Sequence, residues 1–220
     1  MTEAHANPPP AIAPQGGGPQ EIGSQASATQ AIDWEAKYRA GSAPWERAGP
    51  HPAFLDWRTA GTLAPCRILV PGAGRSAEPL ALAEAGFDVT VLDAAPSAVA
   101  VQQARFARIG VHAHAVAADL FAWTPATPFD AIYDQTCLCA LPPALWPDYA
   151  ARLAAWLRPG GALFVLFMQT GQAGGPPFDC DLAVMRRLFG PDLWTWPDTL
   201  APPVPHPTLR EEQPAVLRRS

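Results

Sequence analysis

Two glycines and an aspartate stand at spacings that suit the binding of a nucleoside. Gly72 and Gly74 follow an apolar run that ends at Val70, and Asp93 comes nineteen residues after Gly74. Glycine lets a backbone turn tightly and approach a ligand closely, and a helix that starts after the turn favours polar or anionic groups at its N-terminus. A carboxylate at the end of the next strand can accept hydrogen bonds from both ribose hydroxyls. Together these residues indicate a nucleoside-containing ligand.

The glycine pattern alone leaves other interpretations open. Gly72-x-Gly74-x-x-Ala77 also satisfies the dinucleotide fingerprint, so an NAD(P)-dependent oxidoreductase on a Rossmann-type fold is a rival. The glycines can also do no more than shape a turn, with Asp93 as a helix cap. Asp119 favours a nucleoside without a diphosphate, because a carboxylate after the third strand can reach an adenine amino group. Taken singly, Asp119 is more often a solvated loop residue.

The elements that would position these residues follow from the hydrophobic pattern. From Arg67 onward, short apolar runs alternate with longer amphipathic ones, which is typical of β-α units. The sequence therefore predicts an α/β fold with a mostly parallel central sheet and helices on both faces. The expected strands are Arg67–Val70, Val89–Leu92, His112–Val116, Ala131–Asp134, Ala162–Phe167, Leu193–Trp196 and Ala215–Arg218. The expected helices are 33–41, Pro52–Trp57, one capped by Ser76 and ended by Gly86, Pro96–Ile109, Pro147–Arg158 and Asp181–Phe189.

Composition bounds the domain organisation and the partners. Residues 1–30 are rich in Pro, Gly, Ala, Gln and Ser, so we expect a disordered tail before one domain over 31–220. The net charge is −5 and the basic residues form no run, which argues against a nucleic-acid partner. The longest strongly apolar run, Ala162–Met168, is too short to span a bilayer. With no secretion signal apparent, we expect a cytoplasmic protein without a membrane partner.

The cysteines and histidines do not predict a metal site. Cys137 and Cys139 form a C-x-C pair with no second pair nearby, and His112-x-His114 lies on an expected strand. Neither pair supplies the four ligands of a structural zinc ion, so we expect no metal. Buried free cysteines usually act as small hydrophobic residues. We therefore expect Cys137 and Cys139 to be spectators, with metalloid binding as the alternative.

Four motifs give the chain a resemblance to a known family. They are Trp34-x3-Tyr38-x2-Gly41 with Pro44-Trp45; Val70-Pro71-Gly72-Ala73-Gly74; Tyr133-Asp134-Gln135-Thr136-Cys137-Leu138-Cys139-Ala140-Leu141-Pro142; and Gly175-Pro176-Pro177-Phe178 leading to Leu188-Phe189-Gly190. Over residues 33–218 the chain resembles the class I S-adenosylmethionine (SAM)-dependent methyltransferases, and within them the thiopurine and thiol/halide methyltransferase group. The resemblance implies a Rossmann-like class I methyltransferase fold with SAM as cofactor. It also implies in-line transfer of a methyl group to a small soft nucleophile such as a thiol, a sulfide, a halide or a thiopurine-like sulfur.

The resemblance assigns roles to individual residues. Within an N-terminal cap over residues 31–64, Trp34, Tyr38 and Trp45 would cover the sulfonium end of SAM, although thiol/halide members usually carry Trp at the position of Tyr38. Aromatic faces attract such a cation. The alternative is that the three rings only pack an N-terminal helix. The other implied cofactor contacts are Gly72 and Gly74 to the methionine part, Asp93 to the ribose, Asp119 with the Leu120 backbone to the adenine, Asp134 to the methionine amino group, and Gln135 beside it.

Gln135 marks a departure from the thiopurine-type members, which carry Arg after the Asp that matches Asp134. A neutral amide is a poorer partner than Arg for an aromatic thiol that bears a carboxylate, so the chain is closer to the thiol/halide members. Thiols ionise partly at neutral pH and halides need no base, so no catalytic residue is certain. Gln135 and His51 are the candidates, with surface exposure as the alternative for His51. We expect a monomer, and a non-catalytic SAM-binding module remains an alternative.

Overall fold

The computed structural model describes residues 1, 32–111, 113–206 and 210–220. The expected tail over 1–30 lies outside the described residues except for Met1, and so does His112. The chain divides into two units, Met1–Ile32 and Asp33–Ser220. The second unit contains every helix and strand of the described residues. In these residues no helix is both long enough and apolar enough to cross a membrane.

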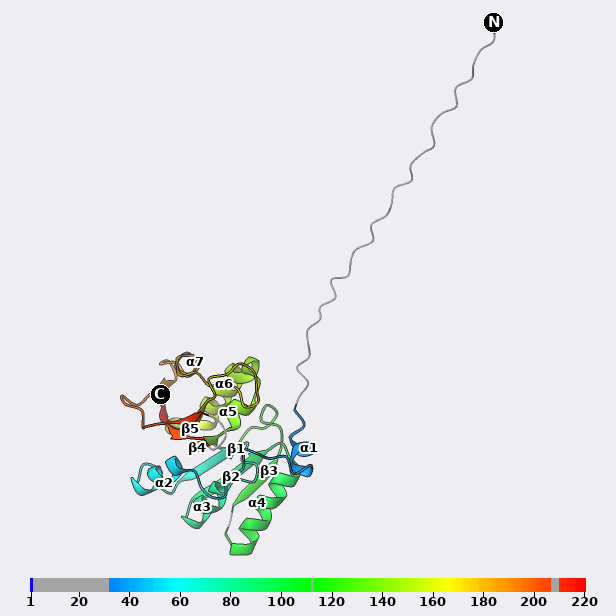
Figure 1. Cartoon of the computed structure of the whole chain (residues 1–220). Helices are drawn as coiled ribbons and strands as arrows, with labels where there is room; N and C mark the ends of the chain where they lie inside the picture. The colour runs from blue at the N-terminus through cyan, green and yellow to red at the C-terminus, as the bar shows by residue number, and fades with distance from the viewer. Residues whose placement is uncertain (2–31, 112, 207–209) are drawn as a thin grey trace. The chain divides into compact units, whose positions relative to one another are not determined.

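A central sheet runs through the second unit (Figure 1). Its strands are β1 (Arg67–Pro71), β2 (Asp88–Asp93), β3 (His114–Ala117), β4 (Phe129–Gln135), β5 (Leu157–Gln169), β6 (Trp194–Thr195), β7 (Val204–Pro205) and β8 (Glu211–Arg219). The order is β3-β2-β1-β4-β5-β8-β6, and β7 also pairs with β8. The first five strands run parallel, whereas β8 is antiparallel to β5. This arrangement confirms the predicted α/β fold with a mostly parallel sheet.

Helices pack on both faces of the sheet. They are α1 (Trp34–Arg39), α2 (Pro52–Thr59), α3 (Glu78–Glu84), α4 (Pro96–Ile109), α5 (Cys137–Ala140), the 3-10 helix η1 (Pro143–Leu145), α6 (Trp146–Trp156) and α7 (Leu182–Leu188). On one face Tyr149, Leu153 and Trp156 of α6 join a core with β4 and β5. On the other face Phe54 and Trp57 of α2 join a second core with alternate residues of the same strands. Burial on both faces explains why the strands are apolar almost throughout.

Local signals place several helix ends where the sequence predicts them. The helix α4 begins at Pro96, where a missing N–H costs nothing, and ends before Gly110, whose φ is +68°. Asp33 caps α1 by accepting a hydrogen bond from the Ala36 N–H at 2.8 Å. The expected cap at Ser76 is wrong, because α3 begins two residues later and no side chain caps it. The carbonyl of Ser76 instead accepts hydrogen bonds from two side chains of α4.

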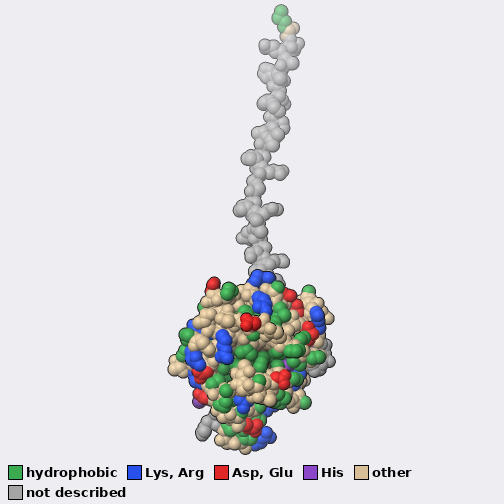
Figure 2. All heavy atoms as spheres, turned by 90° about the vertical axis from the view of Figure 1, so that its left-hand side faces the viewer, with side chains coloured by type: hydrophobic (Ala, Val, Ile, Leu, Met, Phe, Trp, Pro, Cys, Tyr) green, Lys and Arg blue, Asp and Glu red, His purple; other side chains and the backbone are tan. Residues whose placement is uncertain are grey.

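The C-terminal part differs from the sequence prediction in extent. The strand β8 begins at Glu211, four residues earlier than expected, and its residues 211–218 pair with residues 162–169 of β5. A shallow groove of about 340 Å³ separates α2 from the proline-rich segment 201–205 that contains β7. Hydrophobic side chains gather on this face of the molecule (Figure 2). The earlier start of β8 brings its first residues to the end of the sheet that carries the candidate site.

Candidate active site

The loop between β1 and α3 requires glycine at two positions. Gly72 has a φ of +55° and Gly74 a φ of +51°, a region that other residues rarely adopt. A Cβ atom on Gly74 would lie 2.1 Å from the Tyr38 hydroxyl, and one on Gly72 would lie 2.6 Å from the Cys137 Sγ. Neither gap can hold a side chain. Cys137 and Tyr38 therefore pack directly against the backbone of the two glycines.

Asp93 ties this loop to the start of α4. Its Oδ2 accepts a hydrogen bond from the Gly74 N–H at 2.7 Å, and its Oδ1 accepts one from the Ala95 N–H at 2.8 Å. The side chain is buried, and burial raises its pKa, an effect that the two backbone N–H groups partly offset. Each carboxylate oxygen has a second lone pair, so Asp93 can accept further hydrogen bonds from a ligand.

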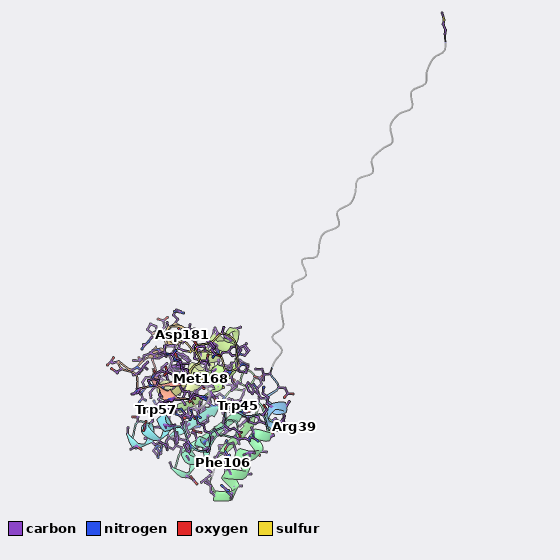
Figure 3. All side chains as sticks on the ribbon, viewed as in Figure 1. Arg39, Trp45, Trp57, Phe106, Met168 and Asp181 are labelled. Atoms are coloured by element: carbon purple, nitrogen blue, oxygen red, sulfur yellow. The ribbon has the colours of Figure 1, made fainter. Side chains whose placement is uncertain are left out.

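Three aromatic rings, here named the aromatic cap, come together over the glycine loop. They belong to Trp34, Tyr38 and Trp45, and the Trp45 ring meets the other two edge to face at centroid distances of 5.6 and 5.8 Å. The Trp45 Nε1–H donates a weak hydrogen bond of 3.4 Å to the Tyr38 hydroxyl. Figure 3 shows Trp45 beside α1. The structure thus brings together three residues that are far from Gly74 in the sequence.

Charged residues that the sequence analysis missed anchor this cap. Glu35 of α1 accepts hydrogen bonds from the N–H and the hydroxyl of Ser97, at 3.0 and 2.8 Å, in the first turn of α4. An acidic group at a helix N-terminus is favourable there. Arg75 of the glycine loop pairs with Glu46 at 2.5 Å and lies 4.9 Å from the centre of the Tyr38 ring. The only available sequence signal was the helical position of Glu35, three residues before Tyr38.

Two polar side chains of α4 donate hydrogen bonds to backbone carbonyls of the glycine loop, and the sequence analysis missed both. The Gln102 Nε2 donates to the carbonyls of Gly74 and Ser76, both at 3.0 Å. Arg105 donates to the carbonyls of Arg75 and Ser76, both at 2.7 Å. These bonds satisfy the carbonyls of a loop that makes few backbone bonds of its own. Nothing in the local sequence distinguishes these two residues from solvated helix residues.

Asp119 lies in the loop after β3, next to the C-terminal end of β2. Its side chain is exposed, and its Oδ1 accepts a hydrogen bond from the Phe121 N–H at 2.7 Å, while Leu120 is buried. The Ala118 N–H donates to the Asp93 carbonyl at 3.0 Å, which places this loop beside Asp93. The adenine contact of Asp119 and Leu120 stays a prediction.

Asp134 and Gln135 leave the end of β4 in different directions. The Asp134 carboxylate is 1% exposed and accepts hydrogen bonds from the Cys137 and Leu138 N–H groups, at 3.1 and 3.3 Å, and from the Tyr149 hydroxyl, at 2.9 Å. Burial raises its pKa to about 6. The partly exposed Gln135 instead receives the Tyr133 hydroxyl on its Oε1 at 2.7 Å. The methionine amino contact of Asp134 stays a prediction.

The cysteines of α5 are buried beside the loop. Cys137 and Cys139 are free thiols, and burial raises the pKa of both well above the usual range. They are therefore neutral at physiological pH. The Cys137 thiol packs against the backbone of Gly72 and fills the space that a side chain at position 72 would need. It shapes the floor of the site.

The expected surface exposure of His51 is wrong. Its side chain is fully buried, because it caps α2 and its Nδ1 accepts a hydrogen bond from the Ala53 N–H at 3.1 Å. Its Nε2 lies 3.0 Å from the Glu212 Oε2. A charged partner 161 residues away holds the ring inside the protein, and no local pattern indicates that. A catalytic role for His51 stays a prediction.

The chain is similar to known proteins in sequence and in fold. The family model described as Thiopurine S-methyltransferase (TPMT) matches residues 29–203. A probable thiol methyltransferase 2 of Arabidopsis thaliana is 32% identical over 161 residues, which cover 72% of this chain and 71% of the relative. Thiocyanate methyltransferase 1 of the same organism is 29% identical over the same coverage. The fold is shared with the crystal structure of Burkholderia thailandensis 1,6-didemethyltoxoflavin-N1-methyltransferase, at a TM-score of 0.67 and 23% identity over 84% of each chain.

Proposed function

Because the chain belongs to the thiopurine S-methyltransferase family and is a SAM-dependent methyltransferase, we propose that it methylates a small sulfur nucleophile beneath the aromatic cap. The observation that carries this proposal is the packing of the cap over the glycine loop, with Gln135 at the end of the neighbouring strand. An NAD(P)-dependent oxidoreductase and a non-catalytic module are not favoured, since the matched family consists of methyltransferases.

The residues at the loop suit SAM as the cofactor. Glycine at positions 72 and 74 allows the left-handed backbone of the loop and its close packing against Cys137 and Tyr38, and Asp93 has free lone pairs for a ribose. The three rings of the aromatic cap suit a sulfonium, because aromatic faces attract cations. We propose these residues, with Asp119 and the Leu120 backbone for the adenine and with Asp134 and Gln135 at the β4 end, as the cofactor site.

When bound, SAM supplies a methyl group on a positively charged sulfur. The chain's own residues have to hold the acceptor in line with that group and keep water away, because a displacement of this kind gains most from positioning. The aromatic cap excludes water above the loop, and the buried Cys137 closes it below. The neutral Cys137 thiol is a poor competing nucleophile, because the thiolate is the reactive form.

Gln135 is proposed to meet the acceptor. The Tyr133 hydroxyl occupies its Oε1, which turns the two N–H donors of the amide away from Tyr133. Two neutral donors suit a small soft anion or a thiol sulfur, and they lack the charged fork that binds a carboxylate. The names of the two plant relatives, a thiol and a thiocyanate methyltransferase, agree with small acceptors of this kind. Halides belong to the same proposal.

The acceptor class can be tested by measuring S-adenosylhomocysteine release with a panel of acceptors. We expect turnover on hydrosulfide, small thiols, thiocyanate or iodide, and little on thiopurines. The Gln135→Arg variant should raise kcat/KM for a carboxylate-bearing aryl thiol about tenfold, because it supplies a charge-assisted fork. The same variant should change kcat/KM for the matching aryl thiol without a carboxylate by less than about threefold. Equal effects on both thiols would contradict the placement of Gln135.

The proposed ribose contact predicts a loss of cofactor affinity in the Asp93→Ala variant. Removing charged hydrogen bonds to the ribose should weaken S-adenosylhomocysteine binding by about 1.5–3 kcal/mol, which is about tenfold to 150-fold in Kd. Isothermal titration calorimetry measures this change. The control is Asp88→Ala, because Asp88 starts the same strand but is exposed. An unchanged Kd in a folded Asp93→Ala protein would refute the contact.

The remaining features of the proposal concern the whole chain. We propose a monomer in the cytoplasm that acts on small molecules and has neither a nucleic-acid nor a membrane partner. The net charge of −5 and the absence of a basic run support the absence of a nucleic-acid partner. Deletion of residues 1–30 should leave the activity intact if that segment is a tail outside the domain.

A further inference from the structure

A buried charged cluster lies at the same end of the sheet, outside the glycine loop. Glu212 is the second residue of β8 and lies opposite Met168, which is close to the end of β5 and is labelled in Figure 3. Its side chain is 1% exposed. The Glu212 Oε2 accepts hydrogen bonds from the Arg47 guanidinium and, at 3.0 Å, from His51. A buried carboxylate with two such donors is ionised.

The hydrogen bonds of His51 fix its tautomer. Its Nδ1 accepts a hydrogen bond from the Ala53 N–H, so a neutral ring carries its proton on Nε2 and donates it to Glu212. The His51 backbone N–H donates to the Glu78 Oε1 at 2.7 Å, which fixes the position of the ring. His51 is therefore a donor to Glu212 in this cluster, and hydrogen bonds occupy both of its ring nitrogens.

The second oxygen of Glu212 has no such partner. Within the described residues, the Glu212 Oε1 is buried and makes no hydrogen bond. A buried acceptor without a donor is costly and requires an explanation, and a ligand group that supplies the donor is one such explanation. The ionisable groups that face Glu212 come from several elements: Arg47 before α2, His51 at the cap of α2, Tyr133 on β4, Cys139 on α5 and His206 after β7.

The position of Glu212 connects it to the acceptor. Tyr133, which orients Gln135, lies close enough to Glu212 for the carboxylate to contribute to the raised pKa of its hydroxyl, and the carboxylate raises the pKa of the Cys139 thiol after β4 in the same way. Met168, opposite Glu212, lies two strands from the glycine loop in the order β1-β4-β5. Glu212 thus lies at the end of the sheet where Gln135 is proposed to meet the acceptor.

We propose that the Glu212 Oε1 binds the S–H group of a neutral thiol acceptor and takes its proton. This inference rests on the proposed function. The S–H bond breaks and an O–H bond forms on Glu212. The electron pair that stays on the acceptor sulfur forms its bond to the methyl carbon as the bond between that carbon and the sulfonium sulfur breaks, and S-adenosylhomocysteine leaves. A carboxylate suffices as the base, because an S–H proton becomes far more acidic as its sulfur bonds to carbon. Burial alone would raise the pKa of Glu212, but His51 and Arg47 outweigh it and keep the group ionised.

Glu212→Gln is the decisive variant, because its amide keeps an oxygen for Arg47 and His51 but replaces the other acceptor with a donor. Near pH 7, kcat/KM for a neutral alkyl thiol should fall about 100-fold or more. For thiocyanate or an aryl thiol that is already ionised, kcat/KM should change by less than about threefold or rise. The loss for the alkyl thiol should shrink as the pH rises and the thiol ionises. The control is Glu211→Gln, which removes a neighbouring charge whose partner is the exposed Arg210.

A second readout does not depend on turnover. With S-adenosylhomocysteine bound, the near-ultraviolet absorbance of a bound aryl thiol reports its ionisation. A nearby carboxylate disfavours the thiolate, so the apparent pKa of the bound thiol should fall by about one unit in Glu212→Gln and stay unchanged in Glu211→Gln. If Glu212→Gln does not fold, Glu212→Asp should show the same selective loss for neutral thiols, because it withdraws the carboxylate by one methylene.

The outcomes separate this inference from the proposed function. Equal losses for neutral and anionic acceptors, with no change in the pKa of the bound thiol, would overturn the proton-acceptor role and leave Glu212 as an anchor for Arg47 and His51. A wild-type protein that methylates none of the sulfur acceptors would overturn the proposed function, and this inference with it. A selective loss for neutral thiols would support both.

Discussion

Replacement of Gly74 by alanine is expected to weaken S-adenosylhomocysteine binding at least 100-fold, which corresponds to about 3 kcal/mol. The new Cβ would lie 2.1 Å from the Tyr38 hydroxyl, at a backbone φ of +51°. Tyr38 would have to leave its place, and its contact with Trp45 would be lost. The loop would also shift, and the Gly74 N–H bond to Asp93 would shift with it. Calorimetric titration gives the change in Kd.

A matched control separates the clash from the cost of the backbone conformation. Gly86 ends α3 with a φ of +85°, and no atom lies within 4 Å of a Cβ placed there. Gly86→Ala therefore carries the conformational cost, about 1 kcal/mol of stability, without a collision. We expect its Kd for S-adenosylhomocysteine to match that of the wild type. If Gly74→Ala also matched the wild type, the aromatic cap would not lie over the loop.

A second substitution tests whether the collision with Tyr38 is the cause. In Gly74→Ala with Tyr38→Phe, the hydroxyl is gone and the nearest ring atom lies 3.2 Å from the Cβ. That distance is tight, but a small movement of the ring relieves it. We expect the double variant to bind S-adenosylhomocysteine about tenfold more tightly than Gly74→Ala alone. Additive losses would instead assign the effect to the loop backbone.

The part of the fold that local signals control could be predicted from the sequence. The two ends of α4 follow from Pro96 and Gly110, and the parallel strands follow from apolar runs that helices cover on both sides. The glycine loop and Asp93 also stand out, because the spacing between them is short. These features depend on residues within one β-α unit, where a pattern in the chain and a contact in space coincide.

The anchors of the site could not be predicted, because their partners are distant in the chain. Glu35 meets Ser97 across 62 residues, and His51 meets Glu212 across 161. A glutamate on a short helix or a histidine before a proline gives no sign of such a partner. The burial of His51 is therefore a tertiary effect. The prediction for Ser76 fails in the opposite direction. Serine is a favourable cap residue, but Ser76 lies outside α3, and its carbonyl accepts a hydrogen bond from Gln102 of α4.

Asp134 carries the second large effect, on stability rather than on binding. Its pKa is about 6 in the folded protein against an ordinary value of 3.8, because burial disfavours the charged form. The folded protein therefore binds the proton more tightly than the unfolded chain does. By linkage, stability is highest below the unfolded pKa and is lost as the pH rises through about 6. A shift of about two units corresponds to about 3 kcal/mol.

The Asp134→Asn variant should remove this loss. Its Oδ1 can still accept from the Cys137 and Leu138 N–H groups, and the Tyr149 hydroxyl can rotate to accept from the new amide. We expect the free energy of unfolding of the variant, relative to wild type, to rise by about 2 to 3 kcal/mol between pH 4 and pH 7.5. Urea unfolding at a series of pH values measures it. A constant difference across that range would mean that Asp134 titrates normally.

The same variant tests the role of Asp134 in cofactor binding, because its stability and its ligand affinity are separate measurements. If the carboxylate meets the methionine amino group, the loss of its charge should raise the Kd for S-adenosylhomocysteine about tenfold or more, although the protein becomes more stable near neutral pH. If the carboxylate serves only α5 and Tyr149, the Kd should stay within about threefold of wild type. A buried charge that lowers stability in the free protein is more readily explained when a cationic ligand group compensates it, and we therefore expect the larger change.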